Sequence, residues 1–325
     1  MGGEESEQGW LAAYELGGTK TIVGLATPAG ELVARHRIPT RTPDETFAVA
    51  AAWFEGELKT RGGEVEAVGV AAFGPLDLRA GRVSRTPKES WSGTDLKTLL
   101  AALHQAPVAL DTDVNAAALA EHRRGAAQGA HVAAYVTVGT GIGAGVVIEG
   151  EPLHGLVHPE AGHQRLRRRP EDAAFRGICP FHGDCVEGLA SGPAMRARWG
   201  VAAEELEADH PGWSLEAALL GAFLASLVLT LSPERIVLGG SVAEGGRLGQ
   251  KALFARVRQS LDEELAGYVA GLSLEGYLLP PALGGDAGLL GAVELARSLT
   301  LGPGPQDRGN LSSRSATPPF GTRSA

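Results

Sequence analysis

The chain opens with short apolar runs of the length and composition of β-strands. Residues 11–18 (LAAYELGG) and 20–27 (KTIVGLAT) are two such runs with glycines between them, and they predict a β-hairpin. Residues 31–40 (ELVARHRIPT) predict a third strand. The N-terminal part of the chain is therefore expected to start as a small antiparallel sheet.

Helical and strand patterns then alternate. Residues 43–62 carry apolar side chains at helical spacing, and residues 115–125 predict a helix that ends at Gly125. Between them, residues 65–74 and 107–113 predict buried strands. This order of strands and helices predicts an α/β fold.

The longest nearly apolar run, residues 217–231, lies between Glu216 and Pro233. Its 15 residues fall short of the roughly 20 that a membrane-spanning helix requires. We therefore expect a buried core helix and no membrane partner.

A weak internal repeat organises the two halves. Residues 17–32 resemble residues 138–153: Thr140 follows Thr19 by 121 positions, as Gly145 follows Gly24. Glycine-rich hairpins can match by chance, but a true repeat predicts two similar α/β halves with facing loops. Such loops could grip a nucleotide triphosphate from both sides.

Composition and charge narrow the class of protein. The 325 residues carry a net charge of −9, which argues against nucleic-acid binding, and nothing near the N-terminus resembles a secretory signal. We expect a cytoplasmic protein in which residues 1–9 and the Pro/Gly/Ser-rich residues 302–325 are disordered. The run of Arg165, Arg167, Arg168 and Arg169 is expected to be a solvated loop.

Two glycine-rich turns are candidate phosphate sites. In ELGGTK, the residues Gly17 and Gly18 permit positive φ and a close approach of backbone N–H groups to an anion, Thr19 and Lys20 add a hydroxyl and a cation, and Glu15 could hold Mg²⁺. In TVGTGIGAG, the corresponding residues are Thr137, Gly139, Thr140 and Gly141. The alternative is that both are ordinary hairpin turns. Gly239 and Gly240 could wall the adenine or ribose pocket.

Asp113 lies where a strand meets a helix, in DTDVNAAALAE. It could be a helix N-cap, or a general base that accepts a proton from a substrate hydroxyl during phosphoryl transfer. The positive helix N-terminus is expected to keep it ionised. Asp111 lies on the same strand face, and these residues alone do not choose between the two.

A candidate metal site follows. Cys179, His182 and Cys185 form a C-x-x-H-x-x-C motif, and His163 lies upstream. Four such ligands fit a closed, structural Zn²⁺ site, whereas the alternatives are a reduced cysteine pair or a disulfide. Glu160 and Glu187 flank the ligands, and their carboxylates are good acceptors for sugar hydroxyls.

Taken together, these motifs resemble those of the ROK sugar kinases, and they are most similar to the bacterial zinc-containing fructokinases. ELGGTK and TVGTGIGAG resemble the two phosphate motifs, HPEAGH the sugar and metal motif, and CPFHGDCVEGLASGP the zinc segment. TPKESW (86–91) resembles a substrate-side loop that usually reads TPKPGW. The resemblance selects Asp113 over Asp111 as the catalytic aspartate.

The resemblance implies an actin-like ATPase (ribonuclease H-like) fold, with two α/β domains around a nucleotide and sugar cleft. We expect a small domain over 10–113 and a larger one over 114–301, whose last helix can pack back on the first. The implied sugar-binding residues are Thr112, Asp113, Glu160, His163 and Glu187.

The implied activity is ATP-dependent phosphorylation of a free hexose, most simply D-fructose to fructose 6-phosphate, with ATP, Mg²⁺ and structural Zn²⁺. A glucokinase, a mannokinase or a broad-specificity hexokinase is the alternative. A non-catalytic sugar-sensing regulator is disfavoured, because Asp113 and both phosphate turns are intact. We also expect a homodimer.

Overall fold

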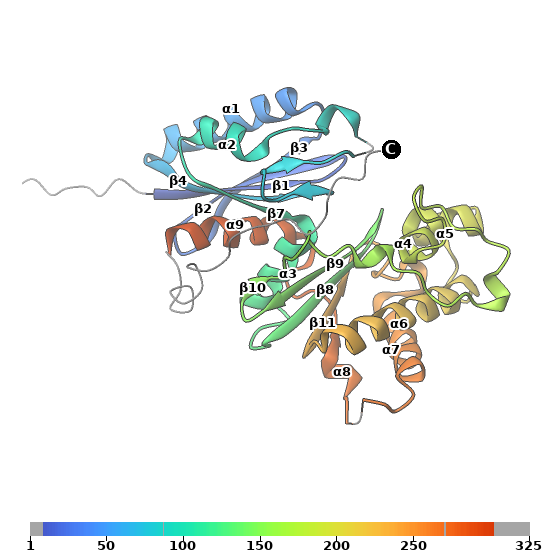
Figure 1. Ribbon diagram of the computed structural model, residues 1–325. Coiled ribbons are helices and arrows are strands. Elements are labelled where there is room, and N and C mark those ends of the chain that lie inside the picture. Colours follow the sequence, from blue (N-terminus) through green and yellow to red (C-terminus); the bar gives the residue numbers. More distant parts are fainter. Residues whose placement is uncertain (1–8, 87, 270, 302–325) are drawn as a thin grey trace, which may run out of the picture.

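The computed structural model describes residues 9–86, 88–269 and 271–301. They form two halves, each built on a five-stranded sheet (Figure 1). Gly9, which we expected in a disordered N-terminus, begins the first strand instead. The remaining residues for which we expected disorder, 1–8 and 302–325, lie outside the described part of the chain.

The first sheet has the strand order β3-β2-β1-β4-β7. Its strands are β1 (Gly9–Leu16), β2 (Lys20–Ala26), β3 (Leu32–Pro39), β4 (Glu64–Ala72) and β7 (Val108–Thr112). The first three are antiparallel, which confirms the predicted hairpin and third strand, and β4 and β7 run parallel to β1. The parallel arrangement brings the ends of β1, β4 and β7 to one edge, where the polar residues follow.

Alternate side chains of this sheet enter two different cores. Trp10, Ala12 and Tyr14 pack with residues of α1 (Pro43–Arg61) and α2 (Leu96–His104) on one face. Leu11 and Ala13 pack with α3 (Asp113–Arg124) and α9 (Ala287–Thr300) on the other. This follows from the two-residue period of a strand. Helix α1 begins at a capping box between Thr42 and Glu45 and ends at Gly62.

The second sheet has the order β10-β9-β8-β11-β12. Its strands are β8 (Val132–Val138), β9 (Ile142–Ile148), β10 (Glu151–Pro152), β11 (Arg235–Gly239) and β12 (Leu278–Leu279). One face packs on α4 (Val186–Ala190), α6 (Gly212–Leu231) and α7 (Gln250–Leu265), and the other on α3. Apart from the sheets lie β5 (Leu76–Asp77), β6 (Arg82–Val83), α5 (Gly192–Trp199) and α8 (Leu274–Tyr277).

The two sheets confirm the internal repeat. In each, a hairpin and a third antiparallel strand lie on one side and two parallel strands on the other, so β8, β9 and β11 correspond to β1, β2 and β4. The two glycine-rich turns are the β1–β2 and β8–β9 connections. They therefore occupy equivalent places in the two halves.

Helices α3 and α9 join the halves. They pack against each other between the sheets, and an added Cβ at Gly291 would lie 2.0 Å from the carbonyl oxygen of Ala116. Glu294 of α9 is fully buried and pairs with Arg123 and Arg124 of α3. Helix α9 thus packs on the N-terminal sheet as well as on α3.

The predicted core helix is α6, which is longer than the apolar run because it begins at Gly212. Among the described residues it is the one helix long and apolar enough to cross a membrane by length and composition. Most of it is buried, including Trp213, Phe223 and Leu224. It therefore has the setting of a core helix.

Candidate active site

A cavity of about 390 Å³ lies where the two halves meet. Six predicted site residues line it, from both phosphate turns, the start of α3 and the turn after β11: Glu15, Lys20, Asp113, Thr137, Gly239 and Gly240. It also includes Ser241, Glu244 and Gln250, which we did not predict as site residues. Ser241 follows the Gly239–Gly240 pair, whereas Glu244 and Gln250 belong to no glycine-rich motif. The volume suits a small-molecule ligand.

Asp113 is the first residue of α3, and Thr112 caps that helix by accepting the N–H of Asn115. The Asp113 side chain is exposed and lines the cavity. Desolvation by the surrounding protein raises its pKa to about 6; backbone N–H groups of Val114 and Asp113 lower the pKa by less, and nearby Glu160 raises it further. We expected the helix N-terminus to dominate, but desolvation outweighs it. Asp113 is still mostly ionised at neutral pH.

Asp111 has a different environment. Its carboxylate is buried and accepts hydrogen bonds from the N–H of Thr112, at 2.7 Å, and from Nδ2 of Asn115, at 2.8 Å. It also lies 2.9 Å from Nε2 of His154. Because Asp111 is enclosed by these partners and Asp113 faces the cavity, the geometry favours Asp113 as the general base.

Glu15 is the second carboxylate in the cavity. Burial raises its pKa to about 7, Lys20 lowers it, and Asp113 and Asp286 raise it. Its Oε2 atom is buried without a hydrogen-bond partner. A buried, unpartnered carboxylate oxygen beside this cavity is a suitable ligand for a divalent cation.

The rest of ELGGTK differs from our expectation. Gly17 and Gly18 do not adopt positive φ, so that part of the interpretation is wrong. Gly17 is required for another reason, because an added Cβ would lie 2.7 Å from the carbonyl oxygen of Lys20, whose backbone accepts the Gly17 N–H at 2.9 Å. Gly18 and Thr19 are exposed at the tip of the turn and do not line the cavity.

The turn is held from the side by the TPKESW segment. Lys88 donates to the carbonyl oxygens of Gly18 and Thr40, and the hydroxyl of Thr40 donates to the carbonyl of Gly17 at 2.8 Å. Trp91 is fully buried, with its Nε1 bound to the carbonyl of Arg41. The substrate-side loop and the first phosphate turn are therefore one connected unit.

The second turn is joined to the predicted sugar-side residue Glu187. Oε2 of Glu187, in the first turn of α4, accepts the N–H of Ile142 at 3.1 Å. Thr140 is exposed at the tip of the turn, and the carbonyl of Gly139 accepts the N–H of Gly192 at 2.8 Å. Gly240 has φ +93 beside the backbone of Val138, where only glycine fits without strain.

His158 is a buried residue next to Glu160 that we did not assign to the site. It is 5% exposed, and its Nε2 lies 2.8 Å from Oε1 of Glu160. A positive charge on His158 lowers the pKa of Asp113, whereas the charge of Glu160 raises it. An added Cβ at Gly74, in the loop after β4, would lie within 4 Å of both side chains. The HPEAGH motif could have indicated His158, because this first histidine of the motif contacts the motif's glutamate, Glu160.

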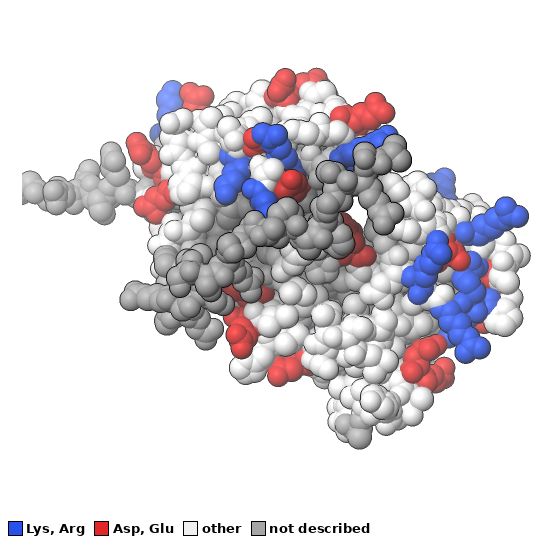
Figure 2. Space-filling model, in the orientation of Figure 1, with Lys and Arg blue, Asp and Glu red and all other residues white. Residues whose placement is uncertain are grey.

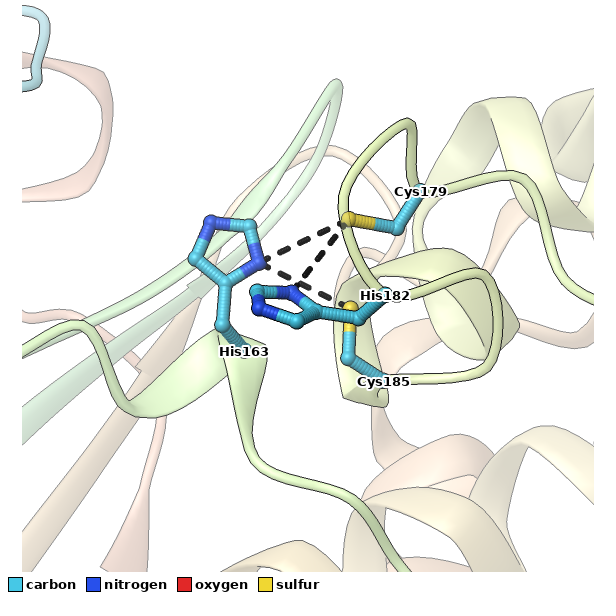
Figure 3. Close-up of side chains that lie close together, drawn as sticks. All are labelled: His163, Cys179, His182 and Cys185. Carbon is cyan, nitrogen blue, oxygen red and sulfur yellow. Dashed lines mark hydrogen bonds between the residues drawn. The ribbon is translucent and has the colours of Figure 1, made fainter. Parts of the chain in front are cut away.

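The four predicted metal ligands come together (Figure 3). Nδ1 of His163 lies 3.8 Å from Sγ of Cys179 and 3.6 Å from Sγ of Cys185, and Nδ1 of His182 lies 3.7 Å from Sγ of Cys179. Both cysteines are free thiols, which excludes the disulfide alternative. The donor set is closed and consists of protein atoms that could hold a metal ion.

The arginine run is more structural than we expected. Arg168 donates to the carbonyl oxygens of Asp172 and Phe175, each at 2.6 Å, and Arg169 pairs with Glu264 at 3.2 Å. Basic and acidic side chains gather together on the surface over α4 and α5 (Figure 2). These arginines brace the segment that leads from His163 to the cysteines.

Comparison with known proteins identifies relatives over nearly the whole folded chain. The ROK family model matches residues 11–298. A fructokinase from Zymomonas mobilis is 42% identical over 289 residues, which covers 87% of this chain and 94% of the relative. Four relatives named fructokinase are 31–42% identical, and three named glucokinase are 29–30% identical.

Solved structures agree with the fold. The ROK hexokinase from Thermus thermophilus has a TM-score of 0.76 and 31% identity, covering 90% of this chain and 99% of its own. A ROK family glucokinase from Streptomyces griseus, in complex with glucose and AMPPNP, has a TM-score of 0.69 and 28% identity, with 89% and 99% covered. These similarities confirm the predicted actin-like ATPase fold.

Proposed function

The chain belongs to the ROK family, and we propose on that premise that it is a sugar kinase that transfers the γ-phosphate of ATP to D-fructose, giving fructose 6-phosphate. The relatives named fructokinase support the choice of sugar, since they are more similar to this chain than those named glucokinase. This chain and the Zymomonas mobilis fructokinase align over most of the length of each. The similarity is therefore not limited to one domain, which supports the same activity.

One observation carries the mechanism: Asp113 opens into a cavity that residues of both phosphate turns also line. The sugar's hydroxyl donates its proton to the Asp113 carboxylate while its oxygen forms a bond to the γ-phosphorus. The bond from that phosphorus to the bridging oxygen of ADP breaks, and ADP leaves. A base with a pKa of about 6 is ionised at pH 7 and still has appreciable proton affinity.

The nucleotide is held between the halves. We propose that Lys20 and Thr137 contact its phosphates from inside the cavity, with Gly17, Gly18, Thr19, Gly139, Thr140 and Gly141 closing over them as the halves approach. Gly239 and Gly240 border the nucleoside end. Glu15 fits as a ligand of Mg²⁺, which neutralises phosphate charge when it is bound.

The sugar occupies the side of the cleft that carries Glu160. Glu160 and Glu187 are proposed acceptors of sugar hydroxyls, and Thr112 contributes by fixing the helix end that presents Asp113. His163 uses Nδ1 toward the sulfur atoms, so its Nε2 is the nitrogen available to the sugar. His158 holds Glu160 in place.

We propose that the His/Cys cluster holds Zn²⁺. Zinc–sulfur and zinc–nitrogen bonds of about 2.3 and 2.1 Å in a tetrahedron place neighbouring donor atoms about 3.6 Å apart. The three donor–donor distances given above, 3.6–3.8 Å, agree with that spacing. With four protein donors the ion is structural, and it orders the segment between His163 and α4.

We further propose a cytoplasmic homodimer, to be tested by cell fractionation and by light scattering on the purified protein. The net charge of −9 supports small-molecule substrates rather than nucleic-acid partners.

The test of function is ADP release from Mg-ATP with fructose, glucose, mannose or no sugar. We expect the largest kcat/KM with fructose and slow release without sugar. A larger kcat/KM with glucose or mannose would support the alternative specificity, and release that no sugar stimulates would refute a sugar kinase.

A further inference from the structure

Asp111 is a buried carboxylate that the proposed reaction does not use. It is 2% exposed and is the last but one residue of β7, close to the start of α3. Oδ1 accepts from the N–H of Thr112 and from Asn115, which leaves Oδ2 for His154 at 2.9 Å. Burying a carboxylate is costly unless such partners surround it. The buried carboxylate of Asp111 therefore needs an explanation. The contacts with Thr112 and Asn115 belong to the start of α3, but the contact with His154 does not.

His154 belongs to the other half of the molecule. It follows β10, in the loop that connects the second sheet to Glu160, and its side chain is 43% exposed. Its bond to Asp111 raises the pKa of the imidazole. The contact links the end of β7 in the first sheet to a loop of the second.

The loop of residues 154–160 contains Glu160, which we propose as an acceptor of a sugar hydroxyl. Leu156 and Val157 at its tip are 90% and 60% exposed, whereas His158 turns back inward beside Glu160. The far end of the loop is fixed at Gly162, whose Cβ position lies 1.8 Å from the carbonyl of Ile142, and at His163 in the metal cluster. On the near side, the His154–Asp111 bond holds the loop against the first half.

We propose that Asp111 and His154 are positioning residues that hold the loop of residues 154–160 in place for sugar binding. This inference rests on the proposed sugar kinase function. The bond fixes the near end of the loop, so that Glu160 stays beside Gly74 and Asp113 before the sugar arrives. Its loss raises the conformational cost of ordering the loop, and that cost falls on the sugar and not on the nucleotide.

The test compares His154→Ala with His154→Gln, whose amide can still donate to Asp111. His131→Ala is the matched control, because His131 is an exposed histidine that precedes β8, at the end of the strand away from the phosphate turn. Since His154 is partly exposed, its replacement should leave folding intact. Asp111→Asn tests the buried partner, with its melting temperature measured alongside.

We expect His154→Ala to raise KM for fructose about fivefold, the effect of losing one hydrogen bond of ordinary strength, with kcat and KM for ATP unchanged. His154→Gln should restore part of the difference, and amide hydrogen exchange across 154–160 should be faster in His154→Ala. If His154→Ala matches His131→Ala in both KM and exchange, or if KM for ATP rises equally, the inference is overturned.

The failure of the proposed function would be a separate result. It would appear as absence of sugar-stimulated ADP release in the unaltered chain, and it would refute the sugar-binding role together with the function. Hydrogen exchange in His154→Ala would then still show whether the bond holds the loop.

Discussion

Asp113 raises the pKa of Glu15 across the cavity that both residues line. Glu15 lies near the end of β1, and Asp113 directly follows β7. These two strands lie on either side of β4 and end at the same edge of the first sheet. Lys20 is the one basic residue among those lining the described cavity. The cavity lining therefore has more acidic than basic side chains. Such a lining repels a bare triphosphate, so we expect a divalent cation to accompany the nucleotide.

Replacing Glu15 tests this relationship. Glu15→Gln should raise the Mg²⁺ concentration needed for half-maximal activity about tenfold, because a charged ligand becomes neutral. Melting temperature of the free protein at pH 8 should not fall, since Glu15 has a raised pKa and carries an unpartnered buried oxygen. Titration of activity with Mg²⁺ at fixed ATP measures the effect. The exposed Glu64→Gln is the control, and equal Mg²⁺ dependence in the two variants would contradict the assignment.

The pH dependence of kcat tests the environment of Asp113. A general base works as the carboxylate, and the pKa of Asp113 is raised to about 6, so the active form is lost as pH falls. At saturating Mg-ATP and fructose, kcat at pH 5 should be about one tenth of its value at pH 8. A solution-like aspartate would keep its activity down to about pH 4. Constant kcat between pH 8 and pH 5 would therefore contradict the desolvated site.

Some features of the fold and of the site could be predicted from the sequence, and others could not. The strand pairs and the four metal ligands were predictable, because each depends on spacing within a short segment. Helix α3 begins two residues earlier than predicted, and its N-cap is Thr112 and not Asp113. The role of Asp111 was not predictable, since it depends on His154, which is 43 positions away. Glu244 and Gln250 were missed for the same reason: the fold, and not a motif, brings them to the cavity.

Some local expectations also failed on physical grounds. The conformation of Gly17 is set by the close approach of the Lys20 carbonyl and not by positive φ. The pKa of Asp113 depends on how much protein surrounds it, which no helix-capping rule contains. The local sequence pattern does not show which distant residues surround a side chain, and so it does not predict how strongly that side chain is desolvated.

Removal of the metal tests the His/Cys cluster. We expect about one equivalent of zinc per chain, and a melting temperature at least about 5 °C lower after chelation, because an ion that binds only the folded chain stabilises it. In Cys185→Ala the melting temperature should be low and unchanged by the chelator. A zinc content below half an equivalent in protein purified without chelators would contradict the site.

Packing of α9 on the first sheet can be tested at Gly69 of β4. An added Cβ there would lie 1.8 Å from the carbonyl oxygen of Ala292, and backbone on both sides leaves no room to adjust. Gly69→Ala should lower the free energy of unfolding by about 1–3 kcal/mol. Gly56→Ala is the matched control, because Gly56 lies in α1 with nothing near its Cβ, and this change should stabilise the protein by about 0.5–1 kcal/mol. Denaturant unfolding of both variants measures the difference, and equal effects would contradict the close packing of α9.

The most direct test of the account is the rate of fructose-dependent ADP release by Asp113→Asn at saturating Mg-ATP and fructose, beside the exposed control Asp209→Asn. Asparagine keeps the shape of the side chain but cannot accept the hydroxyl proton. We predict that kcat of Asp113→Asn falls about 10²- to 10⁴-fold, with melting temperature unchanged or higher, while Asp209→Asn retains full activity. Full activity in Asp113→Asn would contradict the central claim that this carboxylate is the general base of a sugar kinase.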